Sequence, residues 1–99
     1  MSWISVATIW EASIKHATGR LELPQPPDES LCEVALQAQG FRVLSILAAH
    51  AIAAAALPRH HQDPFDRMLI AQAQLEHLTI VTSDAAFEKY EVTVLDARR

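Results

Sequence analysis

The sequence is poor in cysteine and in glycine, with one cysteine and two glycines among its 99 residues. Cys32 has no partner for an internal disulfide, which is typical of proteins in a reducing compartment, and we expect it to be a small buried hydrophobic residue. Scarce glycine and a 51% hydrophobic content exclude a disordered tail and indicate a helix-rich globular chain.

Basic charge and long apolar runs are scarce as well. The net charge of −4 argues against binding of nucleic acid through a broad basic surface, although it is compatible with a site for a divalent cation. The longest apolar run, Leu47 to Leu57, contains His50 and is too short to cross a bilayer. The first residues lack the basic segment of a signal peptide. We therefore expect a cytoplasmic protein with no membrane contact.

The apolar pattern alternates along the chain between the periods of strands and of helices. Strands are predicted over residues 2–6, 41–46, 78–82 and 92–95. Helices are predicted over residues 7–18, from a cap at Asp28 to a stop at Gly40, over 47–57, over 64–77, and as a short turn over 85–89. The helix over 47–57 is so apolar that we expect it to be buried on most sides. Strands that alternate with helices in one domain imply an α/β fold with a parallel sheet.

Local signals mark the ends of the first helix. Thr8 is a candidate N-cap, and Gly19 follows the last apolar position, where a glycine commonly ends a helix. Glu11 and Lys15 lie four residues apart in the favourable order for an ion pair. That ion pair is the structural alternative to any functional role for Glu11.

The richest chemistry lies in residues 58–74, where a polar loop becomes an apolar helix. Asp63 is a good N-cap, Pro64 suits the first helical position, and Asp66 falls in the first turn, where the helix dipole favours negative charge. Capping explains one acidic residue here. It does not explain two that are preceded by His60 and His61.

Three carboxylates are predicted to meet at one end of the sheet. Asp84 follows a strand, Glu11 lies early in the helix after another strand, and Asp66 opens the helix before the third strand. Ligands of parallel α/β sheets gather beyond the carboxyl ends of the strands. Oxygen-rich clusters suit Mg²⁺ or Mn²⁺, which activate water and stabilise a phosphodiester transition state.

Two other interpretations are less favoured. The three histidines at positions 50, 60 and 61 lack the spacing of a zinc site, and the only thiol is remote. His50 is expected to be a partly buried polar residue. The aromatic side chains are expected in the core or in an interface more than as platforms for RNA bases; they are Trp3, Trp10, Phe41, Phe65, Phe87 and Tyr90.

Three segments carry a resemblance to a known family. They are Val6 to Lys15 with Gly19 to Pro24, then Leu57 to Ala73 around Asp-Pro-Phe-Asp-Arg, then Val81 to Asp84 with Phe87 and Tyr90. Together they resemble the PIN-domain family, and most closely its VapC-type toxin ribonucleases, over residues 3–97.

The resemblance implies a metal-dependent ribonuclease. Acidic residues of that family hold Mg²⁺ or Mn²⁺ for RNA cleavage, and the matching positions are Glu11, Asp66 and Asp84, with Asp63 a close neighbour. It also implies contacts with the RNA substrate, for which the candidates are Lys15, His60, His61 and Arg67. A homodimer and a VapB-type antitoxin are the implied protein partners.

The sequence departs from the family at its start. Family members begin with a strand that carries a further catalytic Asp, and this sequence starts after that strand. We therefore expect a PIN-like three-layer parallel sheet with flanking helices, N-terminally incomplete, with four strands and no central strand, in a single domain over residues 1–99. Open edges of such a sheet favour self-association.

Two functions follow from this departure. The first is a Mg²⁺- or Mn²⁺-dependent endoribonuclease that is the toxin of a VapBC-type system. The alternative is a truncated, catalytically weak or inactive remnant that serves as a self-associating or antitoxin-binding module.

Overall fold

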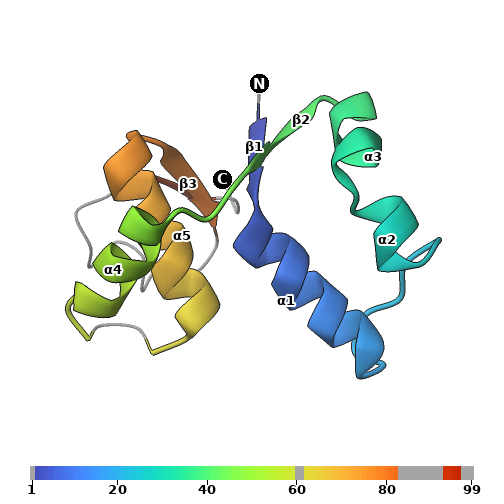
Figure 1. Ribbon diagram of the computed structural model, residues 1–99, viewed down its shortest axis with the longest axis horizontal. Coiled ribbons are helices and arrows are strands. Elements are labelled where there is room, and N and C mark those ends of the chain that lie inside the picture. Colours follow the sequence, from blue (N-terminus) through green and yellow to red (C-terminus); the bar gives the residue numbers. More distant parts are fainter. Residues whose placement is uncertain (1, 60–61, 83–92, 97–99) are drawn as a thin grey trace. The chain divides into compact units, whose positions relative to one another are not determined.

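The computed structural model describes residues 2–59, 62–82 and 93–96. In chain order the elements are β1 (Ser2–Ser5), α1 (Val6–Ala17), α2 (Pro27–Ser30), α3 (Glu33–Ala38), β2 (Phe41–Leu44), α4 (Ala48–Ala56), α5 (Pro64–Glu76), β3 (Thr79–Thr82) and β4 (Thr93–Asp96) (Figure 1). The chain divides into two compact units, an N-terminal unit (Met1–Ser45) and a C-terminal unit (Ile46–Arg99).

The N-terminal unit is built on the parallel pair of β1 and β2, in which Ser2 lies opposite Phe41 and Ser5 opposite Leu44. Helix α1 follows β1 without a loop, because Ser5 is the N-cap and its hydroxyl accepts a hydrogen bond from the Ala7 N–H at 3.0 Å. The expectation that Thr8 caps this helix is therefore wrong. Ser5 is the last residue of β1, and its hydroxyl already accepts an N–H group of the first turn. Thr8 therefore lies inside the helix.

The C-terminal end of α1 lies just before Gly19, as the sequence predicts. Gly19 has a φ of +75°, its N–H donates to the His16 carbonyl, and the Arg20 N–H donates to the Lys15 carbonyl. This pair of hydrogen bonds is a Schellman motif, which requires a left-handed residue that glycine supplies without steric strain.

The single helix expected between Asp28 and Gly40 is instead two short helices, α2 and α3. Pro26 is the N-cap of α2, so Asp28 lies in the first turn and is not the cap. The Ser30 hydroxyl donates to the carbonyls of Gln25 and Pro26, at 2.6 and 2.9 Å. Side-chain bonds of this kind compete with helix continuation, and the extended backbone at Cys32 then starts α3. Cys32 is exposed, so its expected burial is also wrong.

The C-terminal unit is organised around α4 and α5. Its buried hydrophobic cluster is Ala54, Leu57, Ile70 and Ala71, against which Ala53, Met68 and Leu69 pack. Alanine side chains and the larger side chains of Leu57, Ile70, Met68 and Leu69 together make this contact. His77 ends α5 in the left-handed region (φ 55°, ψ 46°) and turns the chain into β3, which pairs in parallel with β4.

Helix α4 is less buried than the sequence predicts. Ile52 in this helix is 72% exposed, and Leu47, the N-cap of α4, is 54% exposed. In the described part of the C-terminal unit, α5 is the main element that packs against α4. A helix with one main neighbour buries one face, so the apolar composition of α4 does not decide how many of its sides are covered.

Both strand pairs are parallel and both units contain helices, which confirms the predicted α/β class with parallel strands. The single sheet without a central strand and the single domain stay predictions, since each pair is described within its own unit. The predicted turn over residues 85–89, with Phe87 and Tyr90, lies outside the described residues. None of the described helices has the length and apolar character needed to span a membrane.

Candidate functional site

The start of α5 has the local structure that the sequence predicts. Asp63 is the N-cap, and its Oδ1 accepts hydrogen bonds from the N–H groups of Phe65 at 2.9 Å and Asp66 at 3.4 Å. Pro64 occupies the first helical position and Asp66 lies in the first turn. Residues three apart are neighbours on a helix surface, so the two half-buried carboxylates are presented together at this helix end.

Glu11 lies in the N-terminal unit, in the middle of α1. Its Oε2 is 3.7 Å from the Nζ of Lys15, which confirms the predicted ion pair. Both side chains are partly exposed, so the pair contributes less than about 1 kcal/mol to stability. A weak and solvated pair leaves Glu11 available for other contacts.

Arg67 has a structural contact that sequence reasoning missed. Its Nη2 donates to the carbonyls of Ala54 at 2.8 Å, Leu57 at 2.9 Å and Ala55 at 3.4 Å, and its Nη1 donates to the Pro58 carbonyl at 3.1 Å. These carbonyls lie at the C-terminal end of α4, where backbone acceptors have no partner within the helix and where the dipole favours a cation. Arg67 therefore ties α5 to the end of α4.

One sequence signal points to this contact. Pro58 follows the apolar helix directly, so the last carbonyls of that helix need partners from elsewhere, and Arg67 is in the first turns of the next helix. The proposed RNA contact of Arg67 stays a prediction, and its guanidinium is already held by backbone oxygens.

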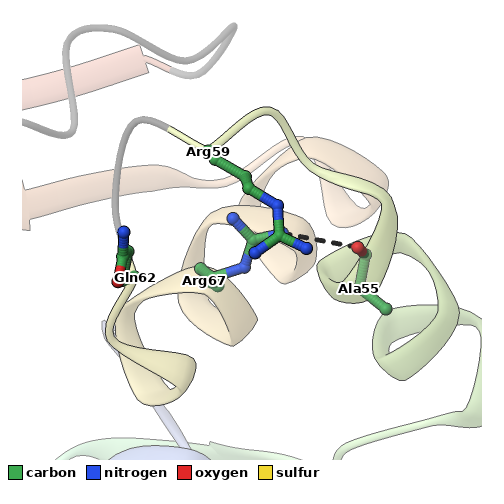
Figure 2. A pocket seen from close by; sticks show the side chains of 4 residues that line it. All are labelled: Ala55, Arg59, Gln62 and Arg67. Carbon is green, nitrogen blue, oxygen red and sulfur yellow. Dashed lines mark hydrogen bonds between the residues drawn. The ribbon is translucent and has the colours of Figure 1, made fainter.

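An open pocket of about 250 Å³ lies at this junction of α4 and α5, lined by Ala55, Arg59, Gln62 and Arg67. Figure 2 shows the side chains of Arg59 and Arg67 over the end of α4, with the Arg67 hydrogen bond to the Ala55 carbonyl. Arg59 and Gln62 are exposed, whereas Arg67 is partly buried. The pocket is therefore polar and carries two guanidinium groups.

His50 is the second feature that the sequence did not reveal. It is 1% exposed, and its Nδ1 accepts the N–H of Leu47 at 3.0 Å while its Nε2 lies 2.8 Å from Oε1 of Glu76. The Gln72 amide nitrogen is 3.4 Å from Nδ1. Since Nδ1 accepts, Nε2 carries the proton that is donated to Glu76. The expectation of a partly buried His50 is wrong: it is a fully buried link between α4 and α5.

The predicted site residues are distributed over both units and over residues outside the described ranges. Glu11 and Lys15 belong to the N-terminal unit, Asp63, Asp66 and Arg67 belong to the C-terminal unit, and His60, His61 and Asp84 lie outside the described residues. Within residues 2–59, 62–82 and 93–96, no group of three or more His, Cys, Asp or Glu side chains is placed to hold a metal. The convergence of the three carboxylates stays a prediction.

Parallel strand pairs and helices in both units, with two carboxylates at the start of α5, define an α/β protein with an acidic helix end. The PIN domain model matches residues 2–92. The chain belongs to the PIN-domain family, which confirms the resemblance at the level of the family and supports a nuclease-type function. Neither the curated proteins nor the solved structures contain a significant match to the chain.

Proposed function

We propose that this PIN domain is a Mg²⁺- or Mn²⁺-dependent endoribonuclease and that it is the toxin component of a VapBC-type system. The observation that carries the proposal is the family match over residues 2–92, which includes the Asp63 to Asp66 helix start and both other acidic positions. The single cysteine suits a cytoplasmic location.

The donor chemistry of the proposed ligands fits such a cation. Glu11, Asp63, Asp66 and Asp84 all offer carboxylate oxygens, the hard ligands that Mg²⁺ and Mn²⁺ prefer. Asp63 accepts hydrogen bonds from two N–H groups through Oδ1, which fixes the orientation of its carboxylate. A bound metal ion would supply an activated water and stabilise charge on the phosphate.

The residues of the chain have separate proposed roles. Glu11, Asp66 and Asp84 are the catalytic carboxylates, and Asp63 orients the first turn of α5 and adds a ligand. Lys15 balances the charge of Glu11, to which it is already paired. His60, His61 and Arg67 contact the RNA.

The test is cleavage of a structured RNA in the presence of Mg²⁺ or Mn²⁺. We expect cleavage by the wild-type chain, none in EDTA, and a decrease of about 100-fold or more for Asp66→Asn, because loss of a ligand exceeds the effect of an outer-shell change. Asp28→Asn makes the same chemical change in the exposed first turn of α2 and should leave the rate unchanged. Equal rates for the two variants, or cleavage in EDTA, would count against a role for Asp66 or for a metal.

Exposed apolar side chains favour a second candidate function, a self-associating or antitoxin-binding module. Trp10 is 59% exposed on α1, and Ile14 lies one turn further along the same helix and is also exposed. Contiguous apolar patches on a surface mark protein interfaces, and residues four apart are neighbours on one face of a helix. Sedimentation of the wild-type chain and of Trp10→Ser measures the oligomeric state. A wild-type dimer that dissociates in the variant supports self-association. A wild-type monomer at high concentration counts against it.

A further inference from the structure

The pocket of Ala55, Arg59, Gln62 and Arg67 carries two positive charges, those of its arginine side chains. None of its described lining residues is acidic. Two guanidinium groups in a space of about 250 Å³ repel each other. An anion in the pocket removes that repulsion, since it attracts both groups.

The two arginines differ in how their charges are used. The charge of Arg67 faces the end of α4, which carries roughly half a negative charge from the helix dipole and has its free carbonyls bonded to this guanidinium. Arg59 makes no hydrogen bond or ion pair with any residue in the described part of the chain. Arg59 therefore brings to the pocket a positive charge that no described residue pairs with.

The pocket is also preorganised on one side. Four backbone carbonyls hold the Arg67 guanidinium, so a ligand does not have to order this side chain. Arg59 and Gln62 come from the loop before α5 and add donors with exposed side chains; Figure 2 shows Arg59 reaching across the pocket beside Arg67. Guanidinium and amide N–H groups of this kind match the oxygens of a phosphate.

The position of the pocket in the chain ties it to the acidic helix start. Gln62 directly precedes Asp63, and Arg67 directly follows Asp66. A phosphate in the pocket is thus bound by the immediate neighbours of both carboxylates. A polyanionic chain has a phosphate at regular intervals, so a chain bound at these carboxylates would present a neighbouring phosphate to the pocket.

We propose that Arg59, Gln62 and Arg67 form a binding site for a backbone phosphate of single-stranded RNA, next to the phosphate that is cleaved. This inference rests on the proposed ribonuclease function and adds to it the element that holds the RNA backbone. Arg59 is the specific determinant, because its charge has no structural partner in the described residues. Arg67 adds its charge to the phosphate site and also fixes the end of α4.

The experiment measures binding without cleavage. The probe is a short fluorescein-labelled single-stranded RNA in EDTA, and its anisotropy is followed at several salt concentrations. Arg59→Gln should weaken binding roughly tenfold and reduce the slope of log K against log salt by about 0.7, the value for one phosphate contact on a single strand. Arg20→Gln makes the same charge change at an exposed arginine of the N-terminal unit and should change neither quantity.

A second pair of variants tests the pocket from its other wall. Ala55→Glu places a carboxylate in the pocket at an exposed position of α4 and should weaken RNA binding more than Arg59→Gln does. Ala49→Glu adds the same charge near the opposite end of α4, where Ala49 is also exposed, and should weaken it much less. All four variants alter exposed side chains, so an unchanged thermal midpoint verifies that they are folded.

Several results overturn the proposal. They are equal losses for Arg59→Gln and Arg20→Gln, equal losses for Ala55→Glu and Ala49→Glu, and absence of RNA binding by the wild-type chain. Binding of inorganic phosphate that depends on Arg59, without a matching effect on RNA, assigns the pocket to a free phosphate instead. Binding of a glutamate-rich peptide that depends on Arg59, again without an effect on RNA, assigns it to a protein partner. Both outcomes also overturn it.

Failure of the proposed function is separately visible. If the wild-type chain binds RNA in an Arg59-dependent manner but does not cleave it with Mg²⁺ or Mn²⁺, the phosphate site stands and the nuclease proposal fails. If the chain cleaves RNA at the same rate and affinity with and without Arg59, the nuclease proposal stands and the phosphate site fails.

Discussion

His50 on α4 and Glu76 on α5 are joined by a hydrogen bond of 2.8 Å between the imidazole Nε2 and the carboxylate Oε1. The same imidazole accepts the N–H of Leu47, the N-cap of α4, at 3.0 Å. One buried side chain therefore completes the start of one helix and links it to the end of the next.

His50→Ala should lower the free energy of unfolding of the C-terminal unit by about 2–4 kcal/mol, because it leaves a cavity and removes the partner of a buried amide and of a cap N–H. Glu76→Gln keeps an acceptor at a partly exposed position and should lower it by less than about 1 kcal/mol. Urea unfolding monitored by circular dichroism measures both. Similar losses for the two variants would show that the buried imidazole is not the centre of this contact.

Arg67→Leu should destabilise the contact of α4 with α5 by about 1–3 kcal/mol, since the carbonyls of Ala54 and Leu57 lose a charged donor. Arg67→Lys should recover part of this loss, because an ammonium group lacks the fork that spans several acceptors. Arg59→Gln, which removes the other arginine of the same pocket, should change the stability by less than about 0.5 kcal/mol. Thermal melting of the three variants measures the order of their stabilities. Equal melting points would contradict the role of Arg67 as a cap of α4.

Substitution of Asp63 should mainly lower the stability of the fold, whereas substitution of Asp66 should mainly lower the rate of RNA cleavage. Asp63→Ala removes the side chain that accepts two N–H groups and should lower the stability by about 1 kcal/mol, whereas Asp63→Ser keeps a cap and should lower it by a few tenths. Asp66→Asn removes a charge from the first turn, which is worth roughly 0.3–1 kcal/mol, and should act mainly on RNA cleavage. Denaturation and cleavage assays on the same samples distinguish them. A large stability loss for Asp66→Asn with an unchanged cleavage rate would reverse the assignment.

Ser5→Ala should destabilise α1 by about 1 kcal/mol, because the buried hydroxyl of Ser5 accepts the Ala7 N–H. Thr8→Ala alters an exposed residue inside the helix and should be neutral or slightly stabilising, since alanine has the higher helix propensity. The midpoints of thermal unfolding compare the two. A larger loss for Thr8→Ala would restore Thr8 as the cap.

Several features that depend on chain neighbours were predictable from the sequence. Gly19 as the end of α1, Asp63 as the cap of α5, and the ion pair of Glu11 with Lys15 all follow from residues within a few positions of each other. The family was also predictable, because the Asp63 to Arg67 motif is specific. The break between α2 and α3 was missed, since the Ser30 hydroxyl competes with the helix for backbone carbonyls.

The α/β class with parallel strands, the acidic start of α5 and the membership of the PIN-domain family were determined by the sequence alone, because each follows from local spacing or from a short motif. The buried position of His50, the capping of α4 by Arg67 and the pocket between Arg59 and Arg67 were decided only by the tertiary structure. The physical reason is that a helix leaves polar groups unsatisfied at its ends, and only the packing of α4 against α5 determines which distant side chain satisfies them.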